Sequence, residues 1–152
     1  MIELKVLVTG GTGYIGRILV PELVKEGYDV TVIDRGFLDY DNPEKDPDFY
    51  SVNIIRDDIR TVDPDILRNQ EAVIDLAALS NDPSGALNPF MTWDINYLGR
   101  VRIARLAKKH GTKIYIVASS CSVYGFREEI SDENTPPNPL TLPPEPPTKV
   151  KS

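Results

Sequence analysis

Val6-Leu7-Val8-Thr9-Gly10-Gly11-Thr12-Gly13-Tyr14-Ile15-Gly16 joins a short apolar run to a glycine-rich turn and then to a helical pattern. Gly10 permits a tight turn, Gly13 lets the main chain approach a phosphate, and Gly16 lets the new helix pack against the strand. Free N–H groups at the start of that helix face a bound anion, and the helix dipole favours negative charge there. The segment therefore predicts a site for the pyrophosphate of a dinucleotide.

The composition is that of a globular protein with an acidic balance. The 152 residues are 41% hydrophobic and 26% charged, and the net charge is -6. This charge argues against nucleic acid or an anionic membrane as a partner, although backbone N–H groups can still bind an anionic cofactor. No apolar run approaches the roughly 20 residues that span a bilayer, and we expect no signal peptide. The single cysteine, Cys121, excludes an internal disulfide, so we predict a cytoplasmic location.

Strand patterns alternate with helical patterns along the chain. We predict helices over 13–26 and 86–110 and strands over 2–9, 29–33, 51–55, 72–77 and 113–118. Such alternation predicts an α/β fold, a Rossmann-like doubly wound parallel sheet with right-handed crossovers and strand order 3-2-1-4-5. A ligand of such a sheet lies at the carboxyl ends of the strands, near the point where the strand order reverses.

The long helical pattern over 86–110 has two apolar faces. One face carries Phe90, Trp93, Tyr97, Val101 and Ala104, and the other carries Ile95, Leu98 and Leu106. We expect one face to lie on the sheet and the other to be available to another surface, such as a second subunit. The only histidine, His110, precedes Gly111, where we interpret it as part of a favourable helix end and not as a catalytic group.

The composition changes after residue 130. Seven of the thirteen prolines lie between Pro136 and Pro147, a density that excludes a helix interior or a central strand. We therefore divide the chain into a dinucleotide-binding domain over 1–130 and a proline-rich tail or loop over 131–152. The tail could be a ligand for another protein, but we favour a solvated segment because nothing else marks a docking motif.

An acidic residue ends the second predicted strand, 18 positions after Gly16. The carboxylate of this residue, Asp34, would accept hydrogen bonds from the ribose hydroxyls of the cofactor and repel a 2′-phosphate, which favours NAD over NADP. Arg35 beside it would soften that preference. The alternative is a simple turn residue at the end of a strand.

Five motifs in order resemble the extended short-chain dehydrogenase/reductase superfamily, and in particular its NAD-dependent nucleotide-sugar epimerases and dehydratases. They are the glycine loop at 9–16, Asp57-Asp58-Ile59-Arg60, Leu76-Ala77-Ala78, Asn96-Tyr97-Leu98-Gly99 and the segment at 119–125. The resemblance covers about residues 2–142 and implies NAD as cofactor, a nucleotide sugar as candidate substrate and no metal. The cofactor contacts that it implies are Gly10, Thr12, Gly13, Tyr14, Ile15, Gly16, Asp34, Arg35, Asp58, Ile59, Leu76, Ala77, Ala78 and Asn96.

The resemblance also implies an active-site serine. The family places this residue four positions before the tyrosine of its Val-Tyr-Gly signature, which here is Ser120 before Tyr124. Its hydroxyl would bind the sugar oxygen that is oxidised, and the alternative is a hydroxyl that caps a strand end. The next two positions, Cys121 and Ser122, replace the Asp-Glu pair that the 4,6-dehydratases use, so that reaction is disfavoured. We expect Cys121 to be a small buried residue and not a nucleophile.

The catalytic base of the family has no counterpart. The family carries Tyr-x-x-x-Lys, and Lys149 matches its lysine, which would contact the nicotinamide ribose. Four positions earlier stands Glu145, within the proline-rich segment. We also expect the sixth strand and the substrate lobe to be absent.

Two hypotheses follow from these departures. The chain is either the NAD-binding domain of an epimerase/dehydratase-like enzyme, or a non-catalytic NAD-binding or interaction module. The family pairs the 86–110 helix with the helix of Tyr-x-x-x-Lys in its dimer contact. We therefore expect weakened or altered homodimerisation here.

Overall fold

A computed structural model describes residues 4–37, 43–80 and 87–139. Its centre is a parallel sheet whose strands follow the order β3-β2-β1-β4-β5, as predicted from the sequence. The strands are β1 (Lys5–Thr9), β2 (Asp29–Ile33), β3 (Asn53–Ile55), β4 (Ala72–Asp75) and β5 (Ile114–Val117). The parallel alignment brings the carboxyl ends of all five strands to one edge, where the predicted ligand site lies.

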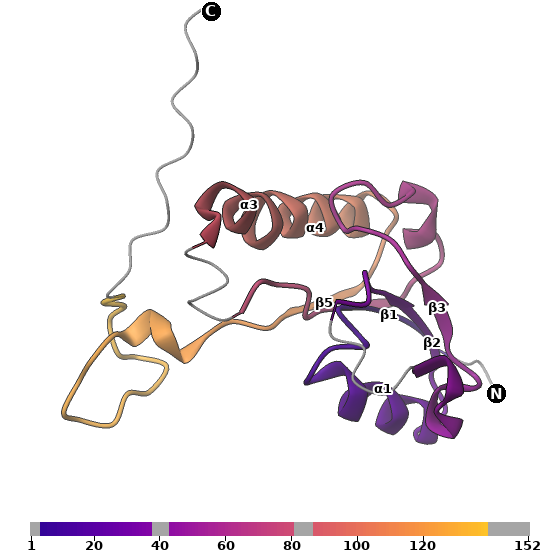
Figure 1. The fold of residues 1–152 in the computed structure, drawn as a ribbon, viewed down its shortest axis with the longest axis horizontal. Helices are drawn as coiled ribbons and strands as arrows, with labels where there is room; N and C mark the ends of the chain where they lie inside the picture. Colours follow the sequence, from indigo (N-terminus) through magenta and orange to yellow (C-terminus); the bar gives the residue numbers. More distant parts are fainter. Residues whose placement is uncertain (1–3, 38–42, 81–86, 140–152) are drawn as a thin grey trace, which may run out of the picture.

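Helices lie on both faces of this sheet, as Figure 1 shows. Helix α1 (Gly16–Lys25) lies on one face, and α3 (Pro89–Trp93), a π-helical stretch (Asp94–Gly99) and α4 (Arg100–Lys109) lie on the other. Short 3₁₀ turns are formed by Pro43–Lys45, Pro47–Phe49, Pro64–Leu67 and Cys121–Tyr124. The three-layer arrangement confirms the predicted Rossmann-like fold.

Two apolar clusters fill the spaces between the layers. The cluster under α1 contains Val6, Val8, Val20, Val30, Val32 and Phe49. The cluster under α4 contains Leu7, Ile33, Ile59, Val62, Leu67, Val73, Ile103 and Ala107. Successive β1 side chains enter opposite clusters, so this strand is apolar at consecutive positions, as expected for a strand buried on both faces.

The element boundaries are shorter than the sequence patterns suggested. Helix α1 begins at Gly16 and not at 13, because Tyr14 and Ile15 lie in the turn that precedes it. Gly27 adopts a φ of 86° just after the helix and ends it, as expected. The predicted division at residue 130 stays a prediction, since residues 140–152 lie outside the described residues.

The apolar faces of the long helix differ from the prediction. Leu98 was expected on the same face as Ile95 and Leu106, but it is 47% exposed, while the other two pack against the core. Ile103 and Ala107, which the pattern did not single out, are buried instead. The buried residues Gly99, Ile103 and Ala107 recur every four positions after Ile95, so they share one face of the helix and Leu98 lies off it. The prediction therefore chose the wrong residues for the core face, although the helical period itself describes the burial.

Candidate dinucleotide-binding site

The glycine loop between β1 and α1 leaves no room for side chains at three positions. Gly10 has a φ of 71°, and a Cβ there would lie 2.9 Å from the backbone nitrogen of Ala77. A Cβ on Gly11 would lie 2.7 Å from Val32 Cγ2, and one on Gly16 would overlap the backbone of Gly11. Gly16 is therefore required because the helix packs on the loop itself, and not only on the strand as the sequence suggested.

The start of α1 carries no side chain that competes with an anion. The residue that precedes the helix, Ile15, offers no side-chain cap, and the first turn contains no acidic residue. The N–H groups of Arg17 and Ile18 donate to the carbonyls of Gly13 at 3.0 Å and Ile15 at 3.1 Å, and the helix dipole attracts negative charge to the turn before them. Tyr14 and Ile15 are 80% and 57% exposed, so a ligand can reach this part of the backbone. This fits the pyrophosphate of a dinucleotide.

Asp34 connects the glycine loop to the end of β2. Its carboxylate accepts hydrogen bonds from the backbone N–H of Thr12 at 3.0 Å and of Gly36 at 2.8 Å. The bond to Gly36 is the turn role that the sequence analysis kept as an alternative. A carboxylate has about four acceptor positions, so two bonds leave capacity for ribose hydroxyls. The ribose contact of Asp34 stays a prediction.

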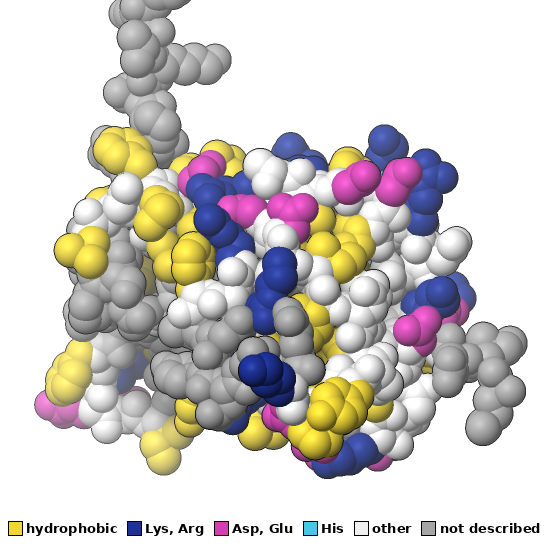
Figure 2. Space-filling model, turned by 45° about the vertical axis from the view of Figure 1, so that its right-hand side comes forward, with side chains coloured by type: hydrophobic (Ala, Val, Ile, Leu, Met, Phe, Trp, Pro, Cys, Tyr) yellow, Lys and Arg dark blue, Asp and Glu magenta, His cyan; other side chains and the backbone are white. Residues whose placement is uncertain are grey.

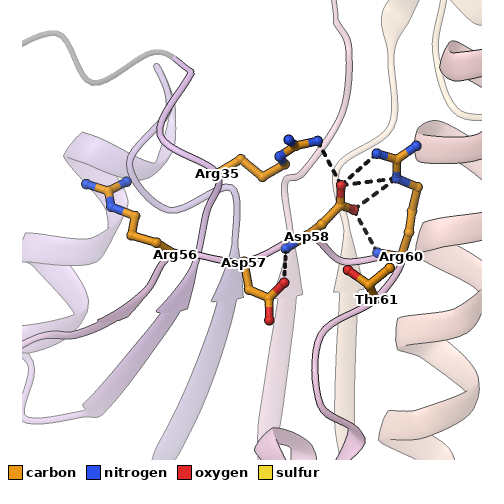
Figure 3. Close-up of a pocket in the computed structure, with 6 residues that line it drawn as sticks. All are labelled: Arg35, Arg56, Asp57, Asp58, Arg60 and Thr61. Atoms are coloured by element: carbon orange, nitrogen blue, oxygen red, sulfur yellow. Dashed lines mark hydrogen bonds and ion pairs between the residues drawn. The ribbon is translucent and has the colours of Figure 1, made fainter.

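A hollow of about 480 Å³ lies at the ends of β2 and β3, and the residue after Asp34 is one of those that line it. Figure 3 shows the residues that line it, which are Arg35, Arg56, Asp57, Asp58, Arg60 and Thr61. Asp58 lies 3.0 Å from Arg35 Nη1 and 2.7 Å from Arg60 Nη2. The hydrogen bond from Arg60 is the main reason that the pKa of Asp58 falls to about 2. Asp58 is therefore a negative charge at neutral pH that lies between two guanidinium groups.

The side chains predicted to contact the cofactor differ in their exposure. Ile59 is 5% exposed and belongs to the core under α4, so its side chain has little surface for a cofactor. Leu76 and Ala77, after β4, are partly buried, whereas Ala78 is exposed. Thr12 is 5% exposed, and its hydroxyl accepts a hydrogen bond from Arg56 at 3.4 Å.

Asn96 fastens the loop that follows β4. Its side-chain oxygen accepts a hydrogen bond from the N–H of Leu79 at 2.8 Å, and its side-chain nitrogen donates to the carbonyl of Leu79 at 2.9 Å. This amide therefore holds the main chain next to the predicted cofactor segment 76–78. Its expected cofactor contact stays a prediction, and the geometry favours an effect through the loop.

Sequence reasoning missed a buried polar network at the carboxyl ends of the strands. Asp75 is fully buried and accepts hydrogen bonds from Thr9 at 2.5 Å, Tyr115 at 2.6 Å and Arg100 at 3.2 Å. Arg100 also donates to the carbonyl of Ala118 at 2.8 Å. The network ties β1, β4, β5 and α4 together just below the predicted ligand. Its signal in the sequence was an aspartate inside the apolar run 72–77.

Ser120 lies on a segment that leads away from the sheet after β5 (Figure 1). It precedes the turn Cys121–Tyr124, and its hydroxyl accepts a hydrogen bond from Ser122 N at 3.2 Å and lies 2.7 Å from Ser122 Oγ. The hydroxyl is thus a turn cap, which is close to the alternative in the sequence analysis. The expectation that Cys121 is buried is wrong, because it is exposed. Lys149 and Glu145 lie outside the described residues.

Neither a metal-binding cluster nor a membrane-spanning helix is found in the described part of the chain. No group of His, Cys, Asp and Glu side chains within 4–37, 43–80 and 87–139 could hold a metal ion. Over the same ranges, no helix is long and apolar enough to cross a membrane. Figure 2 shows basic and acidic side chains interleaved on the face turned to the reader, and not a continuous basic patch.

A family model described as "NAD dependent epimerase/dehydratase family" matches residues 6–146. The chain belongs to this family. Its five-stranded sheet and glycine loop are therefore the cofactor end of a known architecture, and the family is NAD-dependent.

Proteins with similar sequences have names that refer to nucleotide sugars. The chain is 35% identical over 144 residues to a putative UDP-glucose 4-epimerase of Methanocaldococcus jannaschii, covering 90% of this chain and 45% of the relative. It is 36% identical over 142 residues to a UDP-glucose 4-epimerase of Lactobacillus helveticus, covering 90% and 42%. The chain thus spans less than half the length of these relatives.

Solved structures of proteins in complex with nucleotide sugars also resemble this chain, over about half of their own length. A UDP-N-acetylglucosamine 4-epimerase from Methanobrevibacter ruminantium M1 matches with a TM-score of 0.80 and 28% identity, covering 93% of this chain and 46% of that one. The structure of MoeE5 in complex with UDP-glucose and NAD matches with a TM-score of 0.79 and 33% identity, covering 90% and 43%.

Proposed function

We propose that this chain binds NAD as the cofactor half of a nucleotide-sugar epimerase or related enzyme. The observation that carries the proposal is the glycine loop, where Cβ atoms are excluded at Gly10, Gly11 and Gly16 and the helix start has no side-chain cap. Asp34, which accepts a hydrogen bond from Thr12 N in that loop, would bind the hydroxyls of the adenosine ribose.

The substrate class is proposed to be a UDP-sugar. The support comes from the relatives, whose names include UDP-glucose 4-epimerases and a UDP-N-acetylglucosamine 4-epimerase. When bound, NAD supplies a hydride acceptor for a sugar hydroxyl. The chain's own contribution would be the Ser120 hydroxyl, which can turn from Ser122 to bind that sugar oxygen, and Lys149, which would bind the nicotinamide ribose.

A non-catalytic NAD-binding or interaction module is the second candidate. The observation that favours it is Glu145, which stands four positions before Lys149 where the family pattern has tyrosine. A carboxylate has a shorter reach and a much lower ordinary pKa than a phenol, so it would be a weaker base at a different distance from the sugar. The two candidates share the cofactor site and differ in turnover.

Self-association through the long helix is a further part of the proposal. Exposed apolar side chains gather along α3 and the π-helical stretch: Phe90 is 66% exposed, Tyr97 49% and Leu98 47%. A second copy of this chain could cover them, because such clusters mark contact surfaces. Light scattering over a dilution series would test this, and Leu98→Asp should shift the mass toward the monomer. We also propose a cytoplasmic location, on the basis of the composition and the lone cysteine.

The proposal is tested by calorimetric titration with NAD. The wild-type chain should bind NAD, and Asp34→Ala should weaken binding by about tenfold or more, since a carboxylate that accepts two ribose hydrogen bonds is lost. Asp65→Ala, on the exposed turn Pro64–Leu67, is a control that should bind normally. Turnover of UDP-glucose would favour the enzyme, and NAD binding without turnover of UDP-sugars would favour the module. Failure of the wild-type chain to bind NAD would refute the cofactor site.

A further inference from the structure

Arg35 places a positive charge next to the predicted ribose site. It directly follows Asp34, whose carboxylate is fixed between Thr12 N and Gly36 N. Its guanidinium lies over the ring of Phe37, 4.6 Å from the ring centre, and Nη1 lies 3.0 Å from Asp58 Oδ2. Figure 3 shows the side chain extended toward Asp58 and away from Arg56.

Asp58 is held in place independently of Arg35. Its side chain is only 15% exposed, and Arg60 binds it through the backbone N–H at 2.9 Å, Nε at 3.0 Å and Nη2 at 2.7 Å. Arg60 in turn lies 2.9 Å from Asp94. The carboxylate is therefore a rigid and permanently charged partner, whereas the side chain of Arg35 is 45% exposed and can move.

NAD and NADP differ only at the adenosine ribose, where NADP carries a 2′-phosphate. A guanidinium group next to the ribose binds such a phosphate well, because it offers two parallel N–H donors. A carboxylate at the end of the second strand repels it. The chain places both groups side by side as Asp34 and Arg35, so the outcome depends on what else engages the guanidinium.

We propose that Asp58 is a specificity-determining residue, which favours NAD over NADP by holding Arg35 in an ion pair away from the 2′ position. This inference rests on the proposed NAD site. Asp34 alone would then be insufficient, since a free Arg35 would offset its repulsion of the 2′-phosphate. The ion pair between Arg35 and Asp58 joins the ends of β2 and β3, and its two residues are 23 positions apart in the chain.

Asp57 provides a matched control in the same hollow. Its Oδ1 accepts a hydrogen bond from Asp58 N at 2.6 Å, and Figure 3 marks no interaction between its carboxylate and Arg35. Asp57→Asn changes the charge of the hollow by the same amount as Asp58→Asn. The two variants therefore separate the pairing of Arg35 from the overall charge.

The experiment measures the Kd of NAD and of NADP by calorimetry for the full chain and its variants. Asp58→Asn should lower the ratio of the NADP Kd to the NAD Kd by about tenfold, as expected when a guanidinium becomes available to a phosphate. Asp57→Asn should change the ratio by less than about threefold, because long-range charge effects are weak in salt. The double variant Arg35→Gln/Asp58→Asn should lose the gain. Arg35→Gln alone should leave the ratio within about twofold of wild type, since the guanidinium is already engaged.

Three outcomes would overturn the inference while NAD binding itself persists. The Kd ratio could be unchanged in Asp58→Asn, or it could change as much in Asp57→Asn as in Asp58→Asn. The third outcome is a Kd ratio that is still lowered in the double variant, which would indicate that Asp58 repels the 2′-phosphate directly. Arg35→Gln remains informative even if Asp58→Asn folds poorly, because a large loss of NADP affinity would show that Arg35 already binds the phosphate. If the wild-type chain bound neither dinucleotide, the proposed function would fail together with the inference.

Discussion

Strands β1 and β5 belong to the same sheet but are packed very differently. Val6, Leu7 and Val8 of β1 are at most 3% exposed, whereas Ile114 and Ile116 of β5 are 55% and 52% exposed. The register pairs Ile114 with Ala72 and Ile116 with Ile74, which places both isoleucines on the α1 face of the sheet. Among the described residues, α1 does not extend over them.

This difference separates the molecule into a packed nucleotide end and an open strand edge. Around β1, the glycine loop, α1 and β2 bury one another, so the predicted dinucleotide site rests on a complete local core. Around β5, apolar side chains form a surface of the kind that contacts another segment or protein. Mutations at the two ends should therefore have very different effects on the free energy of unfolding.

The largest contrast is expected between two glycines that both have positive φ. Gly10→Ala should lower the free energy of unfolding by about 4 kcal/mol, because left-handed strain is added to overlap with the backbone of Ala77. Gly27→Ala should lower it by about 1 kcal/mol, because nothing lies within 4 Å of the new Cβ and only the strain remains. Urea unfolding of both variants measures the gap, and equal losses would contradict the tight fit of the loop.

A matched pair of aliphatic truncations tests the comparison directly. Leu7→Ala, in fully buried β1, should cost about 3 kcal/mol through lost burial and a cavity. Ile116→Ala, in β5, should cost less than about 1 kcal/mol because the side chain is already half exposed. A large loss at Ile116, measured by the same urea unfolding, would show that β5 is covered in solution.

The charged hollow at the nucleotide end predicts a pH dependence. The pKa of Asp58 falls from 3.8 to about 2 in the folded chain, which corresponds to about 2 kcal/mol of stability. This contribution is fully present above about pH 4, since a depressed folded pKa favours the folded state wherever the carboxylate is ionised. It disappears as the pH falls through about 2.

Asp58→Asn should therefore be less stable than the wild type by about 2 kcal/mol at pH 7, with the gap closing between about pH 4 and pH 2. Urea unfolding of both proteins at about pH 7, about pH 4 and about pH 2 measures this difference in stability. A gap that stays constant across this range would exclude Asp58 as its electrostatic source. Asp63→Asn, at an exposed position, supplies the control.

The smallest effect concerns the buried side of β5. The Tyr115 hydroxyl donates to Asp75, and burial together with this carboxylate raises the pKa of Tyr115. Tyr115→Phe should cost about 1 kcal/mol, the net value of one hydrogen bond, since Thr9 and Arg100 still satisfy Asp75. Thermal unfolding should show a small downward shift, and a loss several times larger would mean that the network fails as a unit.

Sequence patterns predicted the glycine loop because it depends on neighbouring residues, and they predicted the sheet order because few topologies suit alternating strands and helices. Apolar strands alternate with helices, and crossover handedness then restricts the topology. The same patterns were misapplied in the long helix, where Leu98 was assigned to the core face but is exposed. The core face instead includes Gly99, which packs against Ile59 and has no side chain to mark it as a core position.

The sequence by itself determined that β1 is followed by a glycine loop of the kind that can approach a phosphate, and that an acidic residue ends β2. These features need only neighbouring residues, because a missing Cβ or a strand-end carboxylate acts locally. Tertiary structure decided the partners of the buried and charged groups. Thr9 meets Asp75 across 66 positions, and Arg35 meets Asp58 across 23, because parallel strands bring their carboxyl ends together in space. Which charged groups pair at this edge of the sheet is therefore decided by the fold and not by the spacing of residues along the chain.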